Sequence, residues 1–274
     1  MAVTIKPFRS NTAGAVPTTA NLADGEFAVN TADRKIFMRV GSSIVEVASV
    51  ASADFITGLR MTYVSANSFS VSSGAAFIPA ASNVLNVPSA ITKASLSLVA
   101  NSWYHLYLYS NSGAPDIEVS TVAPATSAYF GVARTKNGDT SRRYVGSILT
   151  GAGGAIYRFS HNGDEIQYVT NTDTPFRVLA GGTSTNRTNI SLAGVIPPTS
   201  TYMMGNTINN GDLQLFIDVP EVGNAGTLSR YTCLGGQRTS ITAAVPSRTL
   251  QYFYALPPTG AGAFIDVWGY KYDR

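Results

Sequence analysis

Apolar and polar residues alternate along most of this chain, with a period of two. Near the N-terminus the pattern covers residues 3–9 (VTIKPFR), 35–40 (KIFMRV) and 44–47 (IVEV), with turn-forming residues between the later segments. A period of two places successive side chains on opposite faces of an extended strand. Residues 1–47 are therefore predicted to form a small β meander of short strands joined by tight turns.

Residues 48–60 break this pattern. Apolar or small side chains recur there at intervals of three to four residues, at Ala48, Ala51 or Ser52, Phe55 and Leu59. We interpret the segment either as a short helix or as an extended linker. So narrow a stripe does not stabilise a lone helix, so the helical alternative requires several copies of the chain side by side.

Residues 61–159 are predicted to form a β domain. Within it, the segment WYHLYLY (103–109) carries bulky side chains on both faces of the expected strand: Trp103, His105 and Tyr107 on one and Tyr104 and Leu106 on the other. A strand of this kind is typical of the middle of a sheet that is covered on both sides.

Residues 160–274 contain a further series of strand-like segments, separated by turn residues at roughly ten-residue spacing, as in a β-sandwich. The predicted fold is therefore all-β. It consists of a small N-terminal meander (1–47), a linker or short helix (48–60), and two β-sandwich domains (61–159 and 160–274).

Composition narrows the possible functions. Charged residues make up only 13% of the chain and the net charge is +3, which suits closely packed β surface and symmetric contacts rather than solvated helices. The one basic cluster lies at Arg134, Lys136, Arg142 and Arg143, with Asp139 among them. We interpret it as a solvated hairpin or an ion-pair set, so no nucleic-acid partner is expected.

Few residues suit catalysis or metal binding. His105 and His161 are the only histidines, and Cys233 is the only cysteine, so neither a zinc site nor an intrachain disulfide is expected. Asp116 and Glu118 share one face of a strand, whereas the carboxylates of glycosidases come from separate elements. We expect no catalytic site, no metal and no cofactor, and the chain is interpreted as a non-enzyme.

Aromatic residues are the strongest candidates for binding. Rings stack on sugars and anchor protein interfaces. The candidate receptor-binding residues of the last domain are Tyr202, Tyr252, Tyr254, Trp268 and Tyr270. The alternative is that these rings fill the sandwich core or a subunit contact, in which case the polar loops at 181–189 or 206–212 would carry the site.

Residues 5–47 also resemble a known family. The motif consists of Leu22, Ala23, Asp24, Gly25, Glu26, Ala28, Asn30, Thr31, Asp33, Lys35, Phe37 and Arg39. It is similar to the N-terminal module of bacteriophage tail-fibre and tropism-determinant proteins, although Arg34 stands where a glycine is expected in the turn. Residues 61–160 also look like phage tail-fibre sequence, and the last 110 residues match no family.

The resemblance implies a homotrimeric virion protein of the tail tip or baseplate, made in the host cytoplasm. Residues 1–47 would attach to a baseplate or tail protein. The C-terminal domain would bind a receptor on the bacterial surface, whether glycan, pilus or outer-membrane protein. The alternatives are a tail-borne polysaccharide depolymerase and a purely structural connector. No apolar run approaches the roughly 18 residues that span a bilayer, so no membrane insertion is expected.

Overall fold

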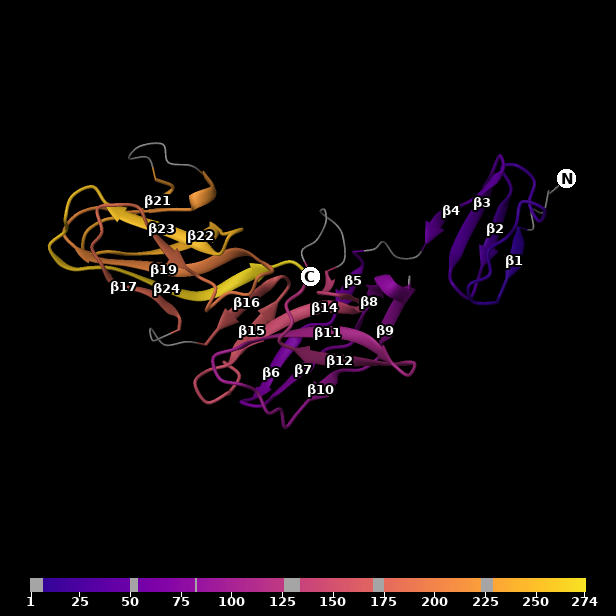
Figure 1. Cartoon of the computed structure of the whole chain (residues 1–274), viewed down its shortest axis with the longest axis horizontal. Helices are drawn as coiled ribbons and strands as arrows, with labels where there is room; N and C mark the ends of the chain where they lie inside the picture. The colour runs from indigo at the N-terminus through magenta and orange to yellow at the C-terminus, as the bar shows by residue number, and fades with distance from the viewer. Residues whose placement is uncertain (1–6, 50–53, 82, 126–133, 170–174, 223–228) are drawn as a thin grey trace.

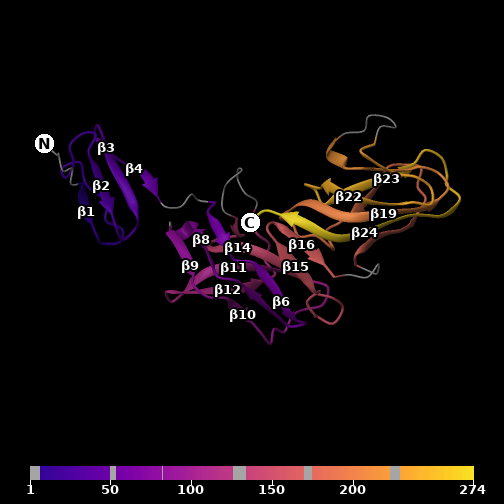
Figure 2. The ribbon, with the colours of Figure 1, turned by 180° about the vertical axis from the view of Figure 1, so that it is seen from behind.

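The structure, a computed structural model, describes residues 7–49, 54–81, 83–125, 134–169, 175–222 and 229–274. The described residues form strands and two short 3-10 turns without an α-helix, which confirms the all-β prediction. Figures 1 and 2 show three units in a row. The small N-terminal module lies at one end, a middle unit follows, and the C-terminal unit occupies the other end.

The N-terminal module is one four-stranded sheet in the order β1-β2-β3-β4. Its strands are β1 (Phe8–Ser10), β2 (Phe27–Asn30), β3 (Lys35–Val40) and β4 (Ser43–Ser49). β2, β3 and β4 form the predicted meander, but β1 runs parallel to β2, with Phe8 opposite Ala28. A parallel neighbour requires a long connection, and residues 11–26 supply it.

The structure corrects the helical alternative for residues 48–60. Strand β4 continues through Ser49, and β5 spans Ile56–Gly58, so both ends of the segment are extended. Residues 50–53 lie outside the described residues. Phe55 and Leu59 instead lie at the two ends of β5, and Leu59 is fully buried in the middle unit.

The middle unit contains three sheets. Their strands are β5, β6 (Met61–Ser65), β7 (Ser68–Val71), β8 (Gly74–Ile78), β9 (Asn83–Val87), β10 (Ile91–Lys93), β11 (Trp103–Asn111), β12 (Ala114–Ser120), β13 (Thr135–Lys136) and β14 (Asp139–Leu149), with a 3-10 turn η1 at Pro79–Ala81. The largest sheet has the order β12-β11-β14-β13. The bulky side chains on both faces of residues 103–109 predicted an inner strand. In the structure β11 is an inner strand of this sheet, and residues 104–108 are all buried.

The C-terminal unit consists of two facing sheets. One has the order β15-β16-β24-β19-β22, with β17 also paired to β24, and the other has the order β18-β23-β20-β21. The strands are β15 (Phe159–Asn162), β16 (Glu165–Tyr168), β17 (Arg177–Gly182), β18 (Thr188–Ser191), β19 (Ser200–Gly211), β20 (Leu215–Asp218), β21 (Tyr231–Cys233), β22 (Arg238–Ala244), β23 (Thr249–Tyr254) and β24 (Gly260–Tyr272), with a 3-10 turn η2 at Pro220–Val222.

One hydrophobic core runs through the middle and C-terminal units, whereas the N-terminal module has a small core of its own. At the junction, the Tyr272 hydroxyl donates to the carbonyl oxygen of Val145 at 3.1 Å, and the Tyr144 hydroxyl bonds to Thr199 at 2.9 Å. The end of β24 is therefore packed into the middle unit. Its position fixes the C-terminal unit against its neighbour.

A neutral histidine lies at the same junction. The backbone N–H of Met61 donates to Nδ1 of His161 at 2.8 Å, so the proton is on Nε2, which donates to the Gly163 carbonyl at 3.1 Å. Burial and then the positive charge of Arg274 lower the pKa of His161 to about 4. Burial, followed by the charge of Arg248, likewise lowers the pKa of His105 to about 4.

We predict that the free energy of unfolding falls as the pH is lowered from 6.5 toward 4. The unfolded chain binds a proton at each histidine below the ordinary pKa of 6.5, while the folded chain stays neutral until about pH 4. Between pH 7 and pH 5 each histidine lowers the stability by on the order of 2 kcal/mol. Urea unfolding at the two pH values measures the loss, and the His161→Gln variant should show about half of it. Equal stability of the wild-type protein at pH 7 and pH 5 would contradict this account.

Candidate functional site

The structure separates the five aromatic candidates into two groups. Tyr254 and Tyr270 are fully buried and Tyr252 is 5% exposed, whereas Tyr202 is 43% exposed and Trp268 is half-buried. Three of the five rings therefore cannot reach a receptor, which corrects the prediction for Tyr252, Tyr254 and Tyr270. Tyr202 and Trp268 remain surface candidates.

Cross-strand pairing explains why the rings of β23 point inward. Tyr252 lies opposite Ile217 and Tyr254 opposite Leu215, both of which are fully buried. Phe253 lies on the opposite face of the strand and is also buried, because Phe216 stacks on it with ring centroids 4.9 Å apart and Arg187 lies over its ring. Alternation correctly placed Tyr252 and Tyr254 on one face, but that face is the core.

Four connections meet at the end of the C-terminal unit farthest from the N-terminal module (Figure 1). They are residues 183–187, 212–214, 234–237 and 255–259, here called the distal turns. Strand register brings them together, because Gly211 of β19 pairs with Gly260 of β24 and Leu215 of β20 pairs with Cys233 of β21. The turn at 183–187 lies within the predicted loop 181–189. Residues 206–211 of the other predicted loop instead belong to β19, and only Asp212 lies in a turn.

A buried asparagine holds the distal turns in place. The Asn209 amide nitrogen donates to the carbonyl oxygens of Leu213 at 2.7 Å and Cys233 at 2.9 Å. Its amide oxygen accepts from the Gly211 N–H at 3.0 Å and from the Tyr254 hydroxyl at 2.7 Å. Every hydrogen-bonding position of this amide is filled. Tyr254, predicted as a receptor contact, therefore acts by positioning the turns.

Close backbone approach also fixes the turns. A Cβ atom at Gly235 would lie 2.7 Å from the carbonyl oxygen of Asp212, so any larger residue would push two turns apart. The carboxylate of Asp212 accepts from the Thr259 N–H at 2.7 Å and links the third turn. The Gly235–Gly236 pair is the sequence signal for this site, and the aromatic residues of the domain do not mark it.

The hydrogen bonds of the N-terminal module explain its motif. The Asn30 amide nitrogen donates to the carbonyl oxygens of Thr12 and Ala15, both at 2.9 Å, and the Asp33 carboxylate accepts from the Gly14 N–H at 2.7 Å. These bonds hold the long connection after β1 over one face of the sheet. Asn30 is 1% exposed, so an apolar replacement would leave several backbone groups without partners.

Two further motif residues hold the second half of that connection. One Nη atom of Arg39 donates to the carbonyl oxygens of Thr19 and Leu22, both at 2.8 Å. The Asp24 carboxylate accepts from the Gly41 N–H at 2.6 Å. The charged motif residues thus build the module's own loops.

Arg34, which replaces the expected glycine, has a φ of 57°. This left-handed conformation is the one that glycine adopts without strain, so the turn keeps its geometry despite the substitution.

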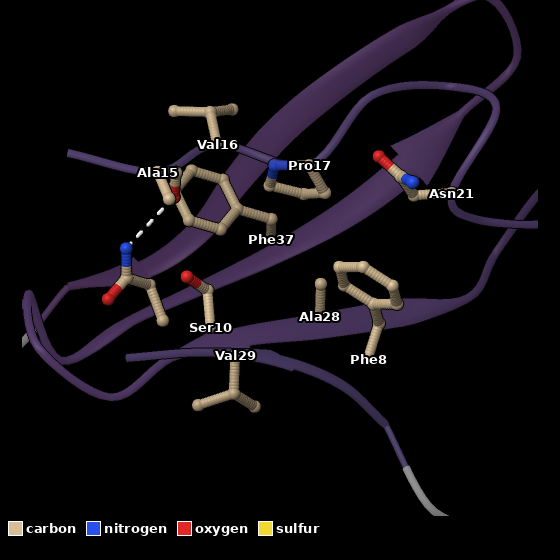
Figure 3. A pocket seen from close by; sticks show the side chains of 10 residues that line it. Phe8, Ser10, Ala15, Val16, Pro17, Asn21, Ala28, Val29 and Phe37 are labelled. Carbon is tan, nitrogen blue, oxygen red and sulfur yellow. Dashed lines mark hydrogen bonds between the residues drawn. The ribbon is translucent and has the colours of Figure 1, made fainter. Parts of the chain in front are cut away.

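The held connection covers an apolar pocket of about 110 Å³ (Figure 3). Its floor contains the buried residues Ala28 and Phe37, and Pro17 forms part of its wall. Phe8 and Val16 on its rim are 45% and 59% exposed. Most of the residues that line it are apolar, and none of them is titratable.

The paired carboxylates of β12 are engaged in ion pairs. Asp116 lies 2.6 Å from Lys93, and Glu118 bonds to Lys136 and lies 2.7 Å from Arg142. Partial burial raises the pKa of each carboxyl, but hydrogen bonds from these cations outweigh it and leave both pKa values lowered. Neither group is poised to protonate a leaving group.

The described histidines and acidic residues do not combine into a metal site. Among the residues that the structure describes, no three His, Cys, Asp or Glu side chains gather as a metal ion would require. His105 is 3% exposed and bonds through Nδ1 to the Ser147 hydroxyl at 2.7 Å. Within the same residues, no helix is long and apolar enough to cross a membrane.

Comparison with known proteins yields a weak structural similarity. No protein-family model and no curated protein matches the chain. Among solved structures, it is similar to the Major Tropism Determinant I1 Variant, with a TM-score of 0.30 and 14% sequence identity. The match covers 71% of this chain and 57% of the other, so the chain corresponds to little more than half of that protein's length.

We predict that Asn209→Ala lowers the free energy of unfolding by about 2–4 kcal/mol, because it leaves several buried backbone groups and the Tyr254 hydroxyl without partners. Asn210→Ala is the matched control, since Asn210 is the next residue of the same strand and is exposed. Urea unfolding compares the two variants. An Asn209→Ala protein as stable as Asn210→Ala would refute the positioning role.

Proposed function

We propose that this chain is a phage host-attachment protein, which joins the virion through residues 1–47 and contacts the bacterial surface through the distal turns. The observation that carries the proposal is the placement of these two surfaces at opposite ends of the molecule (Figures 1 and 2). A protein that links a particle to a cell requires this arrangement. Because residues 5–47 resemble the attachment module of tail fibres, the N-terminal end is the one proposed to join the virion.

The engaged carboxylates and buried histidines favour attachment over the polysaccharide depolymerase alternative. A purely structural connector would have no need for a rigid set of turns at the free end. Asn209 and Gly235 hold such a set in a single arrangement. Preorganised turns lose little conformational freedom on binding, which favours a recognition surface.

The chain is proposed to assemble as a homotrimer through the outer face of the N-terminal sheet. Large apolar side chains are exposed on that face: Phe27 is 49% exposed, Ile36 37% and Val45 42%. Register places Phe27 and Val45 on either side of Met38, and Val29, the partner of Ile36, points away from the pocket in Figure 3. Isolated exposed residues are common, but a continuous apolar sheet face is typical of an interface.

The module's small core supports the same assembly. Its buried apolar residues are Leu22, Ala28 and Phe37, with Ile44 packed against them. A unit of about 40 residues with so few buried side chains needs further contacts to be stable. Copies of the same face supply those contacts, and three copies follow from the tail-fibre resemblance.

We predict that the wild-type protein is a trimer in solution and that the double variant Phe27→Glu/Val45→Glu is not, because charges on the outer face prevent its burial. Light scattering at micromolar concentration measures the mass. Val64→Glu/Val99→Glu, at exposed valines of the middle unit, is the control and should remain trimeric. A monomeric wild-type protein at these concentrations would rule out the assembly.

Deletion of residues 1–49 tests the roles of the two ends. The large core does not include the N-terminal module, so the shortened protein should fold and still bind host cells. It should fail to incorporate into phage particles. Normal incorporation would disprove the attachment role of the module. Because the shortened protein is expected to be a monomer, its binding should be weaker than that of the trimer, and a complete loss of cell binding by the folded protein would mean that the distal turns do not carry the receptor site.

A further inference from the structure

Two exposed leucines stand out on the distal turns. Leu234 is 56% exposed and Leu256 is 65% exposed, although each closely follows the last residue of a strand whose end is buried. Water-exposed leucines are individually unremarkable. Their common position at the free end of the molecule, in turns that are otherwise tightly held, calls for a physical explanation.

The two turns that contain these leucines adjoin the same short segment of chain. The turn that contains Leu234 approaches Gly211 and Asp212, since the Gly236 N–H donates to the Gly211 carbonyl at 3.2 Å. On the other side, a Cβ atom at Gly211 would lie 3.0 Å from the side chain of Pro258, next to the turn that contains Leu256. The two leucines therefore lie in neighbouring turns at the free end of the molecule.

Charged groups at this surface already have partners. The Asp212 carboxylate is fully exposed, and hydrogen bonds with Thr259 lower its pKa, so it remains an anion. Arg187 is paired with Asp218, and Arg238 lies 3.8 Å from Asp266. An acidic polysaccharide or a lipid phosphate calls for a cluster of cations around the ligand, and the distal turns do not supply it.

The distal turns also lack side chains that could stack on sugar rings. Their sequences are TSTNR, DLQ, LGGQ and ALPPT, which contain no aromatic residue. They offer amides, hydroxyls and backbone groups around two aliphatic side chains. Apolar side chains in a polar, largely uncharged rim are the composition of a protein–protein interface.

We propose that the surface around Leu234 and Leu256 binds a protein on the bacterial cell, with the two leucines inserted into apolar depressions of that protein. The inference rests on the proposed host-attachment function and specifies its receptor class. The held backbone presents the leucines in one geometry, so their burial is not opposed by ordering of the turns.

The test uses the full-length protein, fluorescently labelled, on a panel of bacterial strains. A strain that binds it is treated either with proteinase K, which digests surface proteins, or with periodate, which oxidises glycans. We expect proteinase K to abolish binding and periodate to leave it unchanged. We also expect Leu234→Ser/Leu256→Ser to weaken apparent affinity at least tenfold. Val64→Ser/Val99→Ser, at valines 54% and 66% exposed on the middle unit, should bind as wild type.

The outcomes separate this inference from the function on which it rests. Binding that survives proteinase K and is lost after periodate identifies a glycan receptor and overturns the inference, while host attachment stands. Wild-type binding by the correctly folded double leucine variant overturns it as well. Melting temperatures show whether each variant is folded. If the double leucine variant melts at a lower temperature than the wild-type protein, the single variant Leu256→Ser is used in its place. Absence of binding to every strain contradicts the host-attachment function itself.

Discussion

The packing of β24 into the middle unit is the contact on which the rest of the architecture depends. Tyr270 and Tyr272 are both buried, and their hydroxyls donate to backbone carbonyls of β14, those of Ser147 and Val145. Rings placed in this way bury a large apolar area and still satisfy their polar ends. Because β24 also pairs with β19 along its length, this contact sets the direction in which the C-terminal unit, and with it the distal turns, points.

The two ends of the molecule are built by different physical means. In the N-terminal module, side chains such as Asn30 and Arg39 bond to backbone groups close by in the sequence, so a short motif specifies the structure. At the opposite end, strand register brings together four turns that are distant in sequence. Asn209 then fixes them from within the core. The N-terminal module therefore depends mainly on its local motif, whereas the arrangement of the distal turns depends on the sandwich beneath them.

Strand positions were largely predictable from the sequence, because a period of two is a local property. β3 and β11 lie where alternation placed them. The direction of burial was not predictable in the same way. Alternation places Tyr252 and Tyr254 on one face, but only their pairing with Ile217 and Leu215 decides that this face is the core. The parallel position of β1 and the site at the distal turns depend on such long-range contacts too, and a single sequence does not encode them in any short segment.

Hydrogen–deuterium exchange on the full-length protein, with and without outer-membrane vesicles from a strain that it binds, tests the division of roles most directly. The account predicts that backbone amides of residues 234–237 and 255–259 become protected in the presence of vesicles. Amides of residues 8–49, in the module proposed to join the virion, should exchange at an unchanged rate. Protection confined to the N-terminal module, with the distal turns unaffected, would contradict the assignment of the two ends.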